Sequence, residues 1–460
     1  MRTPLAAIAA TLILAAPAHG AATFLPAENY RAHTGPASLL ASSYMVDTRG
    51  WGDVAVVNQA SNDISFLAGT AFGGFAAPVN KPAPSGPVSV AFGPADVEND
   101  INLAIANRAS NSFGMVGNLQ DVVTGEQRLG AAGLQPSAVA TNYFDVIVAN
   151  EGSDTITYAA GDGEGGIGIG NFPAGDGPSG VATADANSDG LADVLVSNRN
   201  AGNVSVLMAG PNPDNTPNRP APPLFAAPVF YPAGAQPSDL AVGQLDGTGR
   251  QDLVVPNEGS STVSALLAQP TGGYAGQVAY RVGSRPTAVT LGDVDGDGRT
   301  DVVVANSGSN TVSVLAGNGN GTFDAARSFR AHTRPSDVAI VDVNQDGAKD
   351  LVVSNAGSND VSVLLQSPAA IASCHKGGKA IVTCGLRVSG SSRRVRAAGR
   401  VTNSTGRIVY ATSAMTINTT PNRTSTMRLV PRARFPEFVS ITVTFSIPGA
   451  RRQVVQTLVT

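Results

Sequence analysis

A unit of about 49 residues recurs seven times in this 460-residue chain and constrains its fold more than any other feature. Each copy opens with Pro before an apolar run, and its second apolar run ends in Asn. The Asn lies at Asn58, Asn107, Asn150, Asn198, Asn257, Asn306 and Asn355. The Pro recurs in step at Pro36, Pro87, Pro136, Pro178, Pro237, Pro286 and Pro335. A period of this length with about four strand-like runs per copy is typical of β-propeller blades rather than solenoid turns. The sequence therefore predicts an all-β chain in which residues 21–366 form a seven-bladed β-propeller.

Some copies carry an acidic nine-residue turn between their first two apolar runs. In the sixth copy Asp293, Asp295, Asp297 and Asp301 stand at positions 1, 3, 5 and 9, with Gly298 at position 6. Carboxylates this close repel one another unless a cation lies among them, and an all-oxygen donor set suits Ca²⁺. The turn is not an EF-hand, because that loop needs a Glu at position 12 and a helix on each side. Position 12 here falls in a β-branched run that predicts a strand.

This D-x-D/N-x-D-G-x-x-D turn between two strands resembles the FG-GAP repeat, also called the VCBS repeat, of integrin-α-type β-propellers. The resemblance implies that Ca²⁺ is bound by the side chains at positions 1, 3, 5 and 9 and by the backbone carbonyl of position 7. The implied ligands are Asp185, Asn187, Asp189, Leu191 and Asp193; Asp293, Asp295, Asp297, Arg299 and Asp301; and Asp342, Asn344, Asp346, Ala348 and Asp350. The fifth copy retains only Asp246, Thr248 and Asp252, which predicts either a weak site or a turn that Arg250 neutralises in place of an ion. Polar turns without an ion remain the alternative, because Asp, Asn and Gly favour turns for backbone reasons alone.

The N-terminus predicts export and ring closure. Residues 1–20 carry Arg2, an apolar run from Leu5 to Ala16 and a small-residue end, the pattern of a secretory signal peptide. That run is too short for a membrane span, and no second one follows, so a secreted protein is expected. The segment Tyr30–Pro36 closely matches Phe329–Pro335, the exit from the sixth blade. An N-terminal strand is therefore expected to complete the seventh blade and close the ring.

The composition changes after residue 371. Residues 371–460 hold 14 Lys and Arg against one acid, a net charge of +13, whereas residues 1–370 hold 16 basic and 33 acidic residues. Alternating runs predict a small immunoglobulin-like β-sandwich in 371–460. Its basic surface has three interpretations: a solvated face, contact with the acidic propeller, or binding of an anionic polymer. Cys374 and Cys384 predict a disulfide in an exported chain.

Signatures of an enzyme are mostly missing from the sequence. It has four His and neither a G-x-S-x-G nor an H-E-x-x-H motif. His33 and His332 stand at equivalent repeat positions, which favours a packing role. The leading hypothesis is a secreted, Ca²⁺-binding propeller that acts as a binding or adhesion scaffold for a protein or polysaccharide, without nucleic acid. The alternatives are a lactonase-like propeller hydrolase and a Ca²⁺-dependent glycan-binding lectin.

Overall fold

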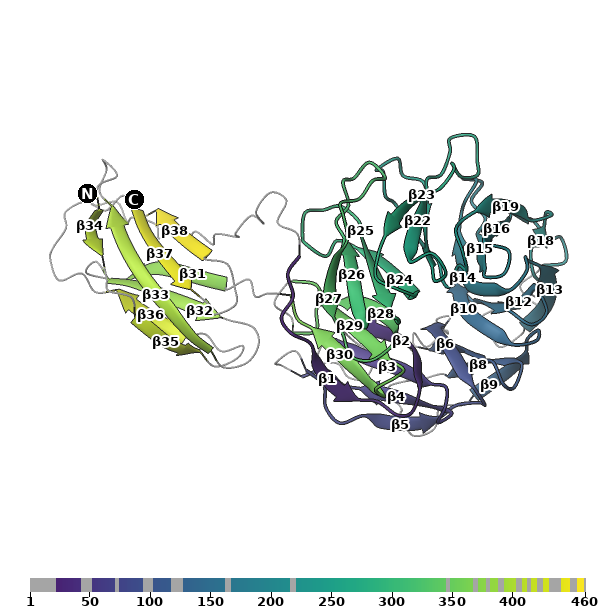
Figure 1. Cartoon of the computed structure of the whole chain (residues 1–460), viewed down its shortest axis with the longest axis horizontal. Helices are drawn as coiled ribbons and strands as arrows, with labels where there is room; N and C mark the ends of the chain where they lie inside the picture. Colours follow the sequence, from purple (N-terminus) through teal and green to yellow (C-terminus); the bar gives the residue numbers. More distant parts are fainter. Residues whose placement is uncertain are drawn as a thin grey trace, which may run out of the picture. The chain divides into compact units, whose positions relative to one another are not determined.

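Seven four-stranded antiparallel sheets follow one another around a ring, as a computed structural model shows (Figure 1). The structure describes residues 22–42, 52–70, 74–93, 102–116, 127–161, 167–215, 221–344 and 348–366, and the backbone of eight strands between 371 and 458. The seven-bladed propeller expected from the repeats is confirmed.

In blades one to six the strands run from the ring axis outwards in chain order, and in blade seven the N-terminal β1 takes the outermost place. The first four blades contain β2 (Pro36–Ser42), β3 (Asp53–Asn58), β4 (Asp63–Leu67) and β5 (Val79–Pro82); β6 (Pro87–Phe92), β7 (Leu103–Asn107), β8 (Ser112–Val116) and β9 (Gln127–Ala131); β10 (Pro136–Asn142), β11 (Asp145–Asn150), β12 (Thr155–Gly161) and β13 (Ile167–Pro173); and β14 (Pro178–Ala184), β15 (Asp193–Asn198), β16 (Asn203–Leu207) and β19 (Val229–Pro232). The last three contain β20 (Ala241–Gly243), β21 (Asp252–Asn257), β22 (Thr262–Leu266) and β23 (Val278–Arg281); β24 (Pro286–Gly292), β25 (Asp301–Asn306), β26 (Thr311–Leu315) and β27 (Arg327–Arg330); and β28 (Pro335–Val341), β29 (Asp350–Asn355), β30 (Asp360–Leu364) and β1 (Glu28–Arg31).

The seventh blade takes its outermost strand from the N-terminus. β1 pairs antiparallel with β30, with Glu28 opposite Val363 and Arg31 opposite Asp360. The ring is thus closed by strands from both ends of the repeat region, as the match between Tyr30–Pro36 and Phe329–Pro335 predicted. Because β1 covers the edge of β30, that strand does not present free backbone groups that could pair with another chain.

The second strand of each blade is almost wholly buried. β25 and β29, for example, have no exposed residue. The hydrophobic core lies between neighbouring blades, where Leu253 and Val255 of β21 pack with Leu195 and Val204 of blade four. Strands covered on both faces read as continuous β-branched runs rather than alternating ones. This explains why runs such as Val302–Val304 mark every copy.

Hydroxyl groups after the repeated Pro link successive blades near the axis. Each donates to the carbonyl oxygen of the next blade's Pro, over 2.8 to 3.2 Å. The pairs are Ser137 to Pro178, Ser179 to Pro237, Ser238 to Pro286, Thr287 to Pro335 and Ser336 to Pro36. Ala37 and Val88 occupy this position in the first two blades. The last of these bonds crosses the closing junction of the ring.

A second link uses the left-handed residue in the turn between the second and third strands. Its side-chain oxygen accepts the backbone N–H that precedes the next blade's Pro. The pairs, acceptor first, are Asn62 and Gly86, Asn111 and Gln135, Asp154 and Gly177, Asn310 and Arg334, and Asn359 and Gly35. Asn and Asp tolerate positive φ better than other side chains, and Asn62 has φ of 56°. A single Asn or Asp therefore both forms the turn and joins two blades.

Aromatic rings join the blades at their outer side. A ring on an outermost strand meets, edge to face, a ring from the next blade's last loop. Three such pairs are Tyr30 with Phe75, Tyr231 with Tyr274 and Tyr280 with Phe323, with centroids 5.3 to 5.4 Å apart. In blade four the partner comes from β18 (Leu224–Phe225), which pairs antiparallel with β17 (Ala209–Gly210). The ring of Phe225 lies edge to face with that of Phe172 in blade three, with centroids 4.9 Å apart.

The strands after residue 371 form a separate compact unit. They are β31 (Ile371–Gly377), β32 (Ile381–Arg387), β33 (Arg393–Thr402), β34 (Ile408–Ala411), β35 (Met415–Thr419), β36 (Ser425–Leu429), β37 (Ser440–Ser446) and β38 (Gln453–Leu458). They make two antiparallel sheets, one of β31, β32 and β36 and one of β33, β34, β35, β37 and β38. The β31–β32 register places Cys374 opposite Cys384. The immunoglobulin-like topology and the disulfide remain predictions.

Candidate metal centre

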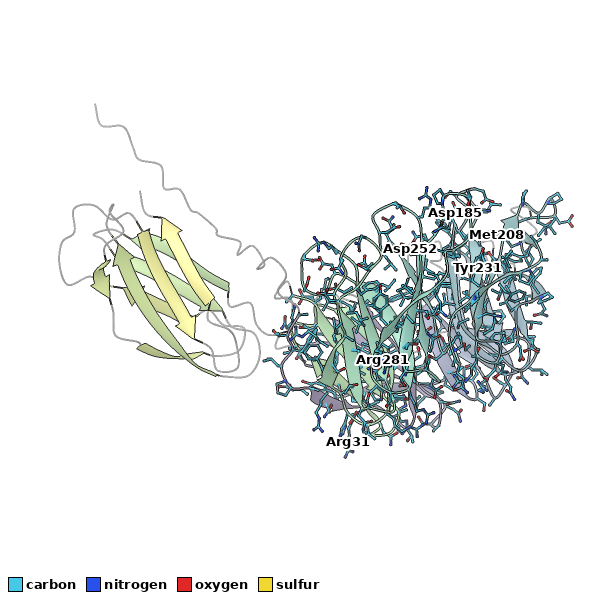
Figure 2. The ribbon with its side chains drawn as sticks, turned by 45° about the horizontal axis from the view of Figure 1, so that its top comes forward. Arg31, Asp185, Met208, Tyr231, Asp252 and Arg281 are labelled. Carbon is cyan, nitrogen blue, oxygen red and sulfur yellow. The ribbon has the colours of Figure 1, made fainter. Side chains whose placement is uncertain are left out.

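The acidic turns connect the first and second strands of blades four to seven, so they all lie at one end of the propeller. In Figure 2 Asp185 and Asp252 lie near that end, and Arg31 lies at the other. Equivalent hairpins must open toward the same face because every blade runs outward in the same strand order. The sequence thus places four related turns on one face of half the ring.

The turn of blade six brings three carboxylates together. One oxygen from each of Asp293, Asp295 and Asp297 lies within 4.8 Å of the others, a separation that a single metal ion can span. Asp293 and Asp295 are half-buried and Asp297 is exposed. Arg299 lies beside them, with its Nη1 3.7 Å from Asp297 Oδ2. Three carboxylates this close in one turn concentrate negative charge, the setting in which a hard cation binds.

Backbone N–H groups fold this turn around Asp293. Its Oδ1 accepts from Gly296 at 2.7 Å and from Asp297 at 3.0 Å, and its Oδ2 accepts from Gly298 at 2.8 Å. Gly296 and Gly298 have φ of 81° and 84°, values that an L side chain rarely adopts. Two left-handed residues therefore wrap the chain around one carboxylate, and in blade four the first of these positions is taken by Ser188, with φ of 64°.

The turn of blade four repeats this fold with a different third residue. Asp185 accepts the N–H groups of Asp189 and Gly190, at 3.0 and 2.9 Å. Asn187 replaces an acid, and its Nδ2 donates to Asp189 Oδ2 at 2.9 Å. Leu191, whose backbone carbonyl is the expected ligand at position 7, follows directly after Gly190. The predicted donors at positions 1, 3 and 5 thus lie in one turn.

The acid at position nine, Asp301, lies apart from the other three acids of the turn. Asp301 is buried, and its Oδ2 accepts the N–H of Val294 at 2.9 Å while its Oδ1 accepts the N–H of Gly317 at 2.8 Å. It therefore ties the acidic turn to the loop after β26. Burial, with a smaller contribution from the nearby charge of Asp295, raises the pKa of Asp301 to about 6. This carboxylate is primarily a structural link between two loops.

The same link recurs in the other blades with acidic turns. Asp193 accepts from Ala186 and Ala209, and Asp252 accepts from Leu245 and Ala268. Burial raises the pKa of both carboxyls. In blade seven Val343 donates to Asp350 at 3.1 Å.

Blades one and three retain this link without an acidic turn, which sequence reasoning missed. Asp53 Oδ1 accepts the N–H of Gly69 at 2.9 Å. Asp145 Oδ1 accepts the N–H of Gly161, and Tyr158 donates its hydroxyl to Oδ2 at 2.7 Å in place of the missing turn. The signal was an Asp directly before the second strand in copies that had otherwise lost the motif.

The remaining predicted ligands are placed as follows. In the fifth copy Asp246 Oδ1 accepts both the N–H and the hydroxyl of Thr248, at 2.9 and 2.7 Å, so the turn closes on itself. In the seventh copy Asp342, Asn344, Ala348 and Asp350 are described, with Asn344 and Asp350 buried. Asp346 lies outside the described residues.

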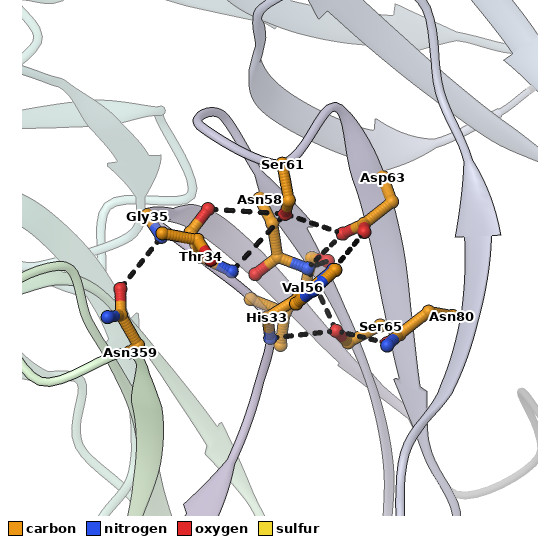
Figure 3. A network of polar contacts seen from close by, with 10 residues as sticks. All are labelled: His33, Thr34, Gly35, Val56, Asn58, Ser61, Asp63, Ser65, Asn80 and Asn359. Atoms are coloured by element: carbon orange, nitrogen blue, oxygen red, sulfur yellow. Dashed lines mark hydrogen bonds and ion pairs between the residues drawn. The ribbon is translucent and has the colours of Figure 1, made fainter.

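The two described His–Asp pairs occupy one repeat position in blades one and seven. The His33 ring contacts Asp63, whose other oxygen accepts from Asn58 and Ser61 at 2.8 and 3.0 Å (Figure 3). His332 and Asp360 repeat the arrangement. Blades three to six place Gly at the His position and Thr or Asn at the Asp position. The pairs therefore belong to the hydrogen-bond network that holds the Asn at the end of each second strand, here Asn58 and Asn355.

Two further acids lie in the innermost layer of the ring, Asp337 in β28 and Asp239 just before β20. Asp337 Oδ2 accepts from Ser38 Oγ and Leu39 N–H, both at 2.9 Å, across the closing junction of the ring. Asp239 Oδ2 accepts from Val289 N–H of the next blade at 3.0 Å. The seven innermost strands carry no other charged residue among the described positions. Burial raises the pKa of Asp239 to about 7 and that of Asp337 to about 6, and the charge of Asp337 adds to the shift of Asp239.

These shifts predict that the propeller loses stability as the pH rises from about 4 toward 7. A carboxyl whose pKa is higher in the folded state than its usual value of about 3.9 binds its proton more tightly in that state. Its contribution to folding is therefore complete at low pH and is lost as the pH rises through the folded pKa. Each unit of pH in that window costs about 1.4 kcal/mol for one such group.

Asp239→Asn is expected to reduce this pH dependence, because the amide oxygen can still accept the Val289 N–H. Thermal unfolding between pH 4.5 and 8 in chelator measures it, with the exposed Asp324→Asn as control. Parallel pH profiles for Asp239→Asn and the unsubstituted protein would contradict the expectation.

Comparisons with known proteins agree with this architecture. A family model described as an FG-GAP-like repeat matches residues 141–196, 244–304 and 293–353. These ranges contain the acidic turns of blades four to seven and the shortened turn of blade three. No curated protein matches the chain.

Solved structures similar to this chain have low sequence identity to it. A chain of Polycomb Repressive Complex 2 from Chaetomium thermophilum is 10% identical, with a TM-score of 0.53 over 74% of this chain and 98% of that one. A protein of unknown function from Desulfotomaculum acetoxidans is 13% identical, with a TM-score of 0.49 over 80% of this chain and 98% of that one.

The fold and the position of the turns define a seven-bladed β-propeller with repeated polar turns on one face. Because those turns lie in matched repeats, the chain is an FG-GAP-repeat propeller protein. Such a propeller fits a binding scaffold. No helix in the described residues is long and apolar enough to cross a membrane.

Proposed function

We propose that this protein is a Ca²⁺-stabilised binding scaffold that acts outside the cytoplasm. The observation that carries the proposal is the convergence of the Asp293, Asp295 and Asp297 carboxylates within 4.8 Å. Clustered oxygen donors of this kind suit the flexible, six- to eight-fold coordination of Ca²⁺ better than the strict octahedron of Mg²⁺.

Three turns would each hold one ion. In blade six the three carboxylates and the backbone carbonyl of Arg299 would bind the ion. Asp301 would either hold the turn in place through its backbone hydrogen bonds or supply a fifth oxygen ligand. Blade four uses Asp185, Asn187, Asp189 and Leu191 with Asp193, and blade seven uses the equivalent set from Asp342 to Asp350. Blade five, where Asp246 already accepts from Thr248, holds an ion weakly. Bound Ca²⁺ removes the repulsion among the acids and fixes the hairpins of the loop-bearing face.

Chelation is the direct test of this role. A ligand that binds only the folded state stabilises that state, by about 2.7 kcal/mol when its concentration is 100 times its Kd. The melting temperature rises as a consequence. Calorimetric unfolding should therefore show a higher transition temperature in Ca²⁺ than in chelator. Asp297→Asn should lose part of the gain, whereas Asp324→Asn, an exposed acid elsewhere in blade six, should keep all of it. Equal melting curves with and without chelator would contradict Ca²⁺ binding.

The partner would bind on the face that the turns stiffen, since binding residues are commonly carried by loops on a rigid scaffold. The basic 371–460 region would contact an anionic polymer or the acidic propeller. Binding is favoured over catalysis because both described His–Asp pairs are engaged in the repeat's own bonding.

Export is part of the same proposal. The pattern of residues 1–20 is that of a signal peptide, and Ca²⁺ sites of moderate affinity fill readily outside the cell. Expression followed by N-terminal sequencing of the mature protein checks it. A mature chain beginning between residues 21 and 23 is expected, and an intact N-terminus in the cytoplasmic fraction would contradict export.

A further inference from the structure

The face opposite the acidic turns is crossed by seven loops, each of which runs from the end of an outermost strand to the Pro of the next blade. The loops that follow blades one to four hold one charged residue, Asp176, and are residues 82–86, 131–135, 173–177 and 232–236. The loops that follow blades five to seven hold five Arg and no acid, and are residues 281–285, 330–334 and 31–35. We call these arginines the basic sector: Arg281, Arg285, Arg330, Arg334 and Arg31. Five of the 16 Lys and Arg of residues 1–370 thus lie in three short loops.

Hydrogen bonds join these three loops into one continuous surface. In blades six and seven, the turn between the second and third strands donates a backbone N–H to the loop before it, and its Asn accepts the N–H of the loop after it. The bonds are 2.8 to 2.9 Å long and join, donor first, Ser307 to Arg285, Arg334 to Asn310, Ala356 to Arg334 and Gly35 to Asn359. The loops therefore follow one another along an arc. In Figure 2 Arg31 and Arg281 lie away from the side that carries Asp185 and Asp252.

The positive charge of the basic sector is only partly neutralised within the propeller. Glu258 pairs with Arg285, but it also pairs with Arg199 of blade four. The other acids at this end of the neighbouring strands, Asp63 and Asp360, are buried and contact His rings. Within the described part of the chain the other four arginines of the sector form no ion pair, and all five are exposed. Exposed guanidinium groups on one surface repel one another unless an anion lies among them.

The repeat itself shows that the fold does not require these arginines. Where the last three blades end their outermost strand in Arg, the first four have Pro82, Ala131, Pro173 and Pro232. Arg285 and Arg334 are left-handed, with φ of 51° and 54°, and Gln135 and Gln236 take the same position with the same two values. Arginine therefore brings no backbone advantage at either position. A residue that the fold does not need points to a function.

We propose that the basic sector binds an acidic polysaccharide, a linear polymer with carboxylate or sulfate groups repeated along it. A guanidinium group donates two parallel hydrogen bonds to either kind of anion. Because the arginines come from three successive loops along an arc, they suit a row of anionic groups better than one small anion. The choice of a polysaccharide rests on the export proposed above, whereas the surface itself does not depend on Ca²⁺.

The side chains around the arginines disfavour other acidic macromolecules. Single-stranded nucleic acids bind through aromatic side chains on which bases stack, and the three loops contain no Phe, Tyr or Trp. The nearby rings of Tyr30 and Tyr280 are half-buried against Phe75 and Phe323. A folded acidic protein would need an apolar centre to its interface. Val282, the one large hydrophobic residue of the loops, packs against the core instead.

Isothermal titration of the full chain in chelator with polygalacturonate and with dextran sulfate tests this surface. Chelator keeps Ca²⁺ from bridging a polymer to the acidic turns. Binding of at least one polymer is expected, and the polymer that binds identifies the anionic group. Neutral dextran and free galacturonate should bind at least about tenfold more weakly, because neither offers a row of anions.

Variants of the basic sector separate its binding from that of residues 371–460, whose net charge of +13 also attracts polyanions. Arg281→Ala combined with Arg330→Ala should weaken binding about tenfold or more, and Arg334→Gln should weaken it less. The slope of log affinity against log salt should fall by about one for each arginine removed. Arg327→Ala is the matched control, because it removes an exposed Arg from the opposite end of the strand that ends in Arg330.

The variants place Ala or Gln where other blades already have them, and thermal unfolding checks that they are folded. Variants that bind as the unsubstituted chain does would place all binding in residues 371–460 and contradict the proposal. Equal weakening by Arg327→Ala would contradict it too, since net charge alone would then explain binding. So would a failure of both polymers to bind, or tighter binding of an oligothymidylate than of either polymer. All of these outcomes are measured without Ca²⁺, so they are independent of the test of the scaffold proposal.

Discussion

Removal of residues 24–34 is expected to abolish cooperative unfolding of the entire propeller. The deletion takes away β1, and with it the outer edge of the seventh blade and the Tyr30–Phe75 ring contact between blades seven and one. β30 is then an open edge at the one place where the ring depends on two distant parts of the chain. A propeller protects its strands only when it is closed, so the damage spreads beyond one blade.

Calorimetry and chymotrypsin digestion measure this effect. The truncated chain should show a broad transition or none, and it should be cleaved at many sites under conditions in which the full chain is resistant. Arg31→Ala, which removes an exposed side chain at the end of the same strand, serves as the control and should unfold normally. A truncated chain with an unchanged sharp transition would mean that closure by β1 does not hold the ring together.

Asp301→Ala is expected to cost about 2–4 kcal/mol of stability even in the absence of Ca²⁺, because it leaves two buried backbone N–H groups without an acceptor. Those groups belong to Val294 and Gly317, on the two loops that the Asp301 carboxylate joins. Asp301 is 1% exposed, so water does not readily replace the lost bonds.

Asp297→Ala provides the matched comparison in chelator. It removes an exposed carboxylate from the same turn, and without Ca²⁺ it should be neutral or slightly stabilising, because it relieves repulsion with Asp293 and Asp295. Chemical denaturation of both variants in chelator separates the two roles. An equal loss of stability in both would show that position nine is no more structural than the other acids.

The architecture could be predicted from the sequence because repetition reduces ambiguity. One short apolar run is consistent with either a strand or a helix, but the same run before Asn58, Asn306 and Asn355 at matched spacing must have one structure. The match between the segments at Tyr30 and Phe329 even predicted how the ring closes.

The links between blades could not be predicted, since they depend on which neighbours the fold brings together. Nothing in the local sequence shows that Ser336 donates to Pro36, or that Asn359 accepts from Gly35, 324 residues away. The role of Asp301 was hidden for the same reason. Motif spacing counts it with the other acids, whereas burial and two backbone donors set it apart.

Isothermal titration of the chelated, dialysed protein with Ca²⁺ tests the central claim most directly. Three equivalents are expected at the strong sites, from the turns of blades four, six and seven, with blade five adding at most one weak site. Asp297→Asn should remove one equivalent and leave the other two, and Asp324→Asn should remove none. Titration without heat, or with a stoichiometry that Asp297→Asn does not change, would contradict the assignment of Ca²⁺ to these turns.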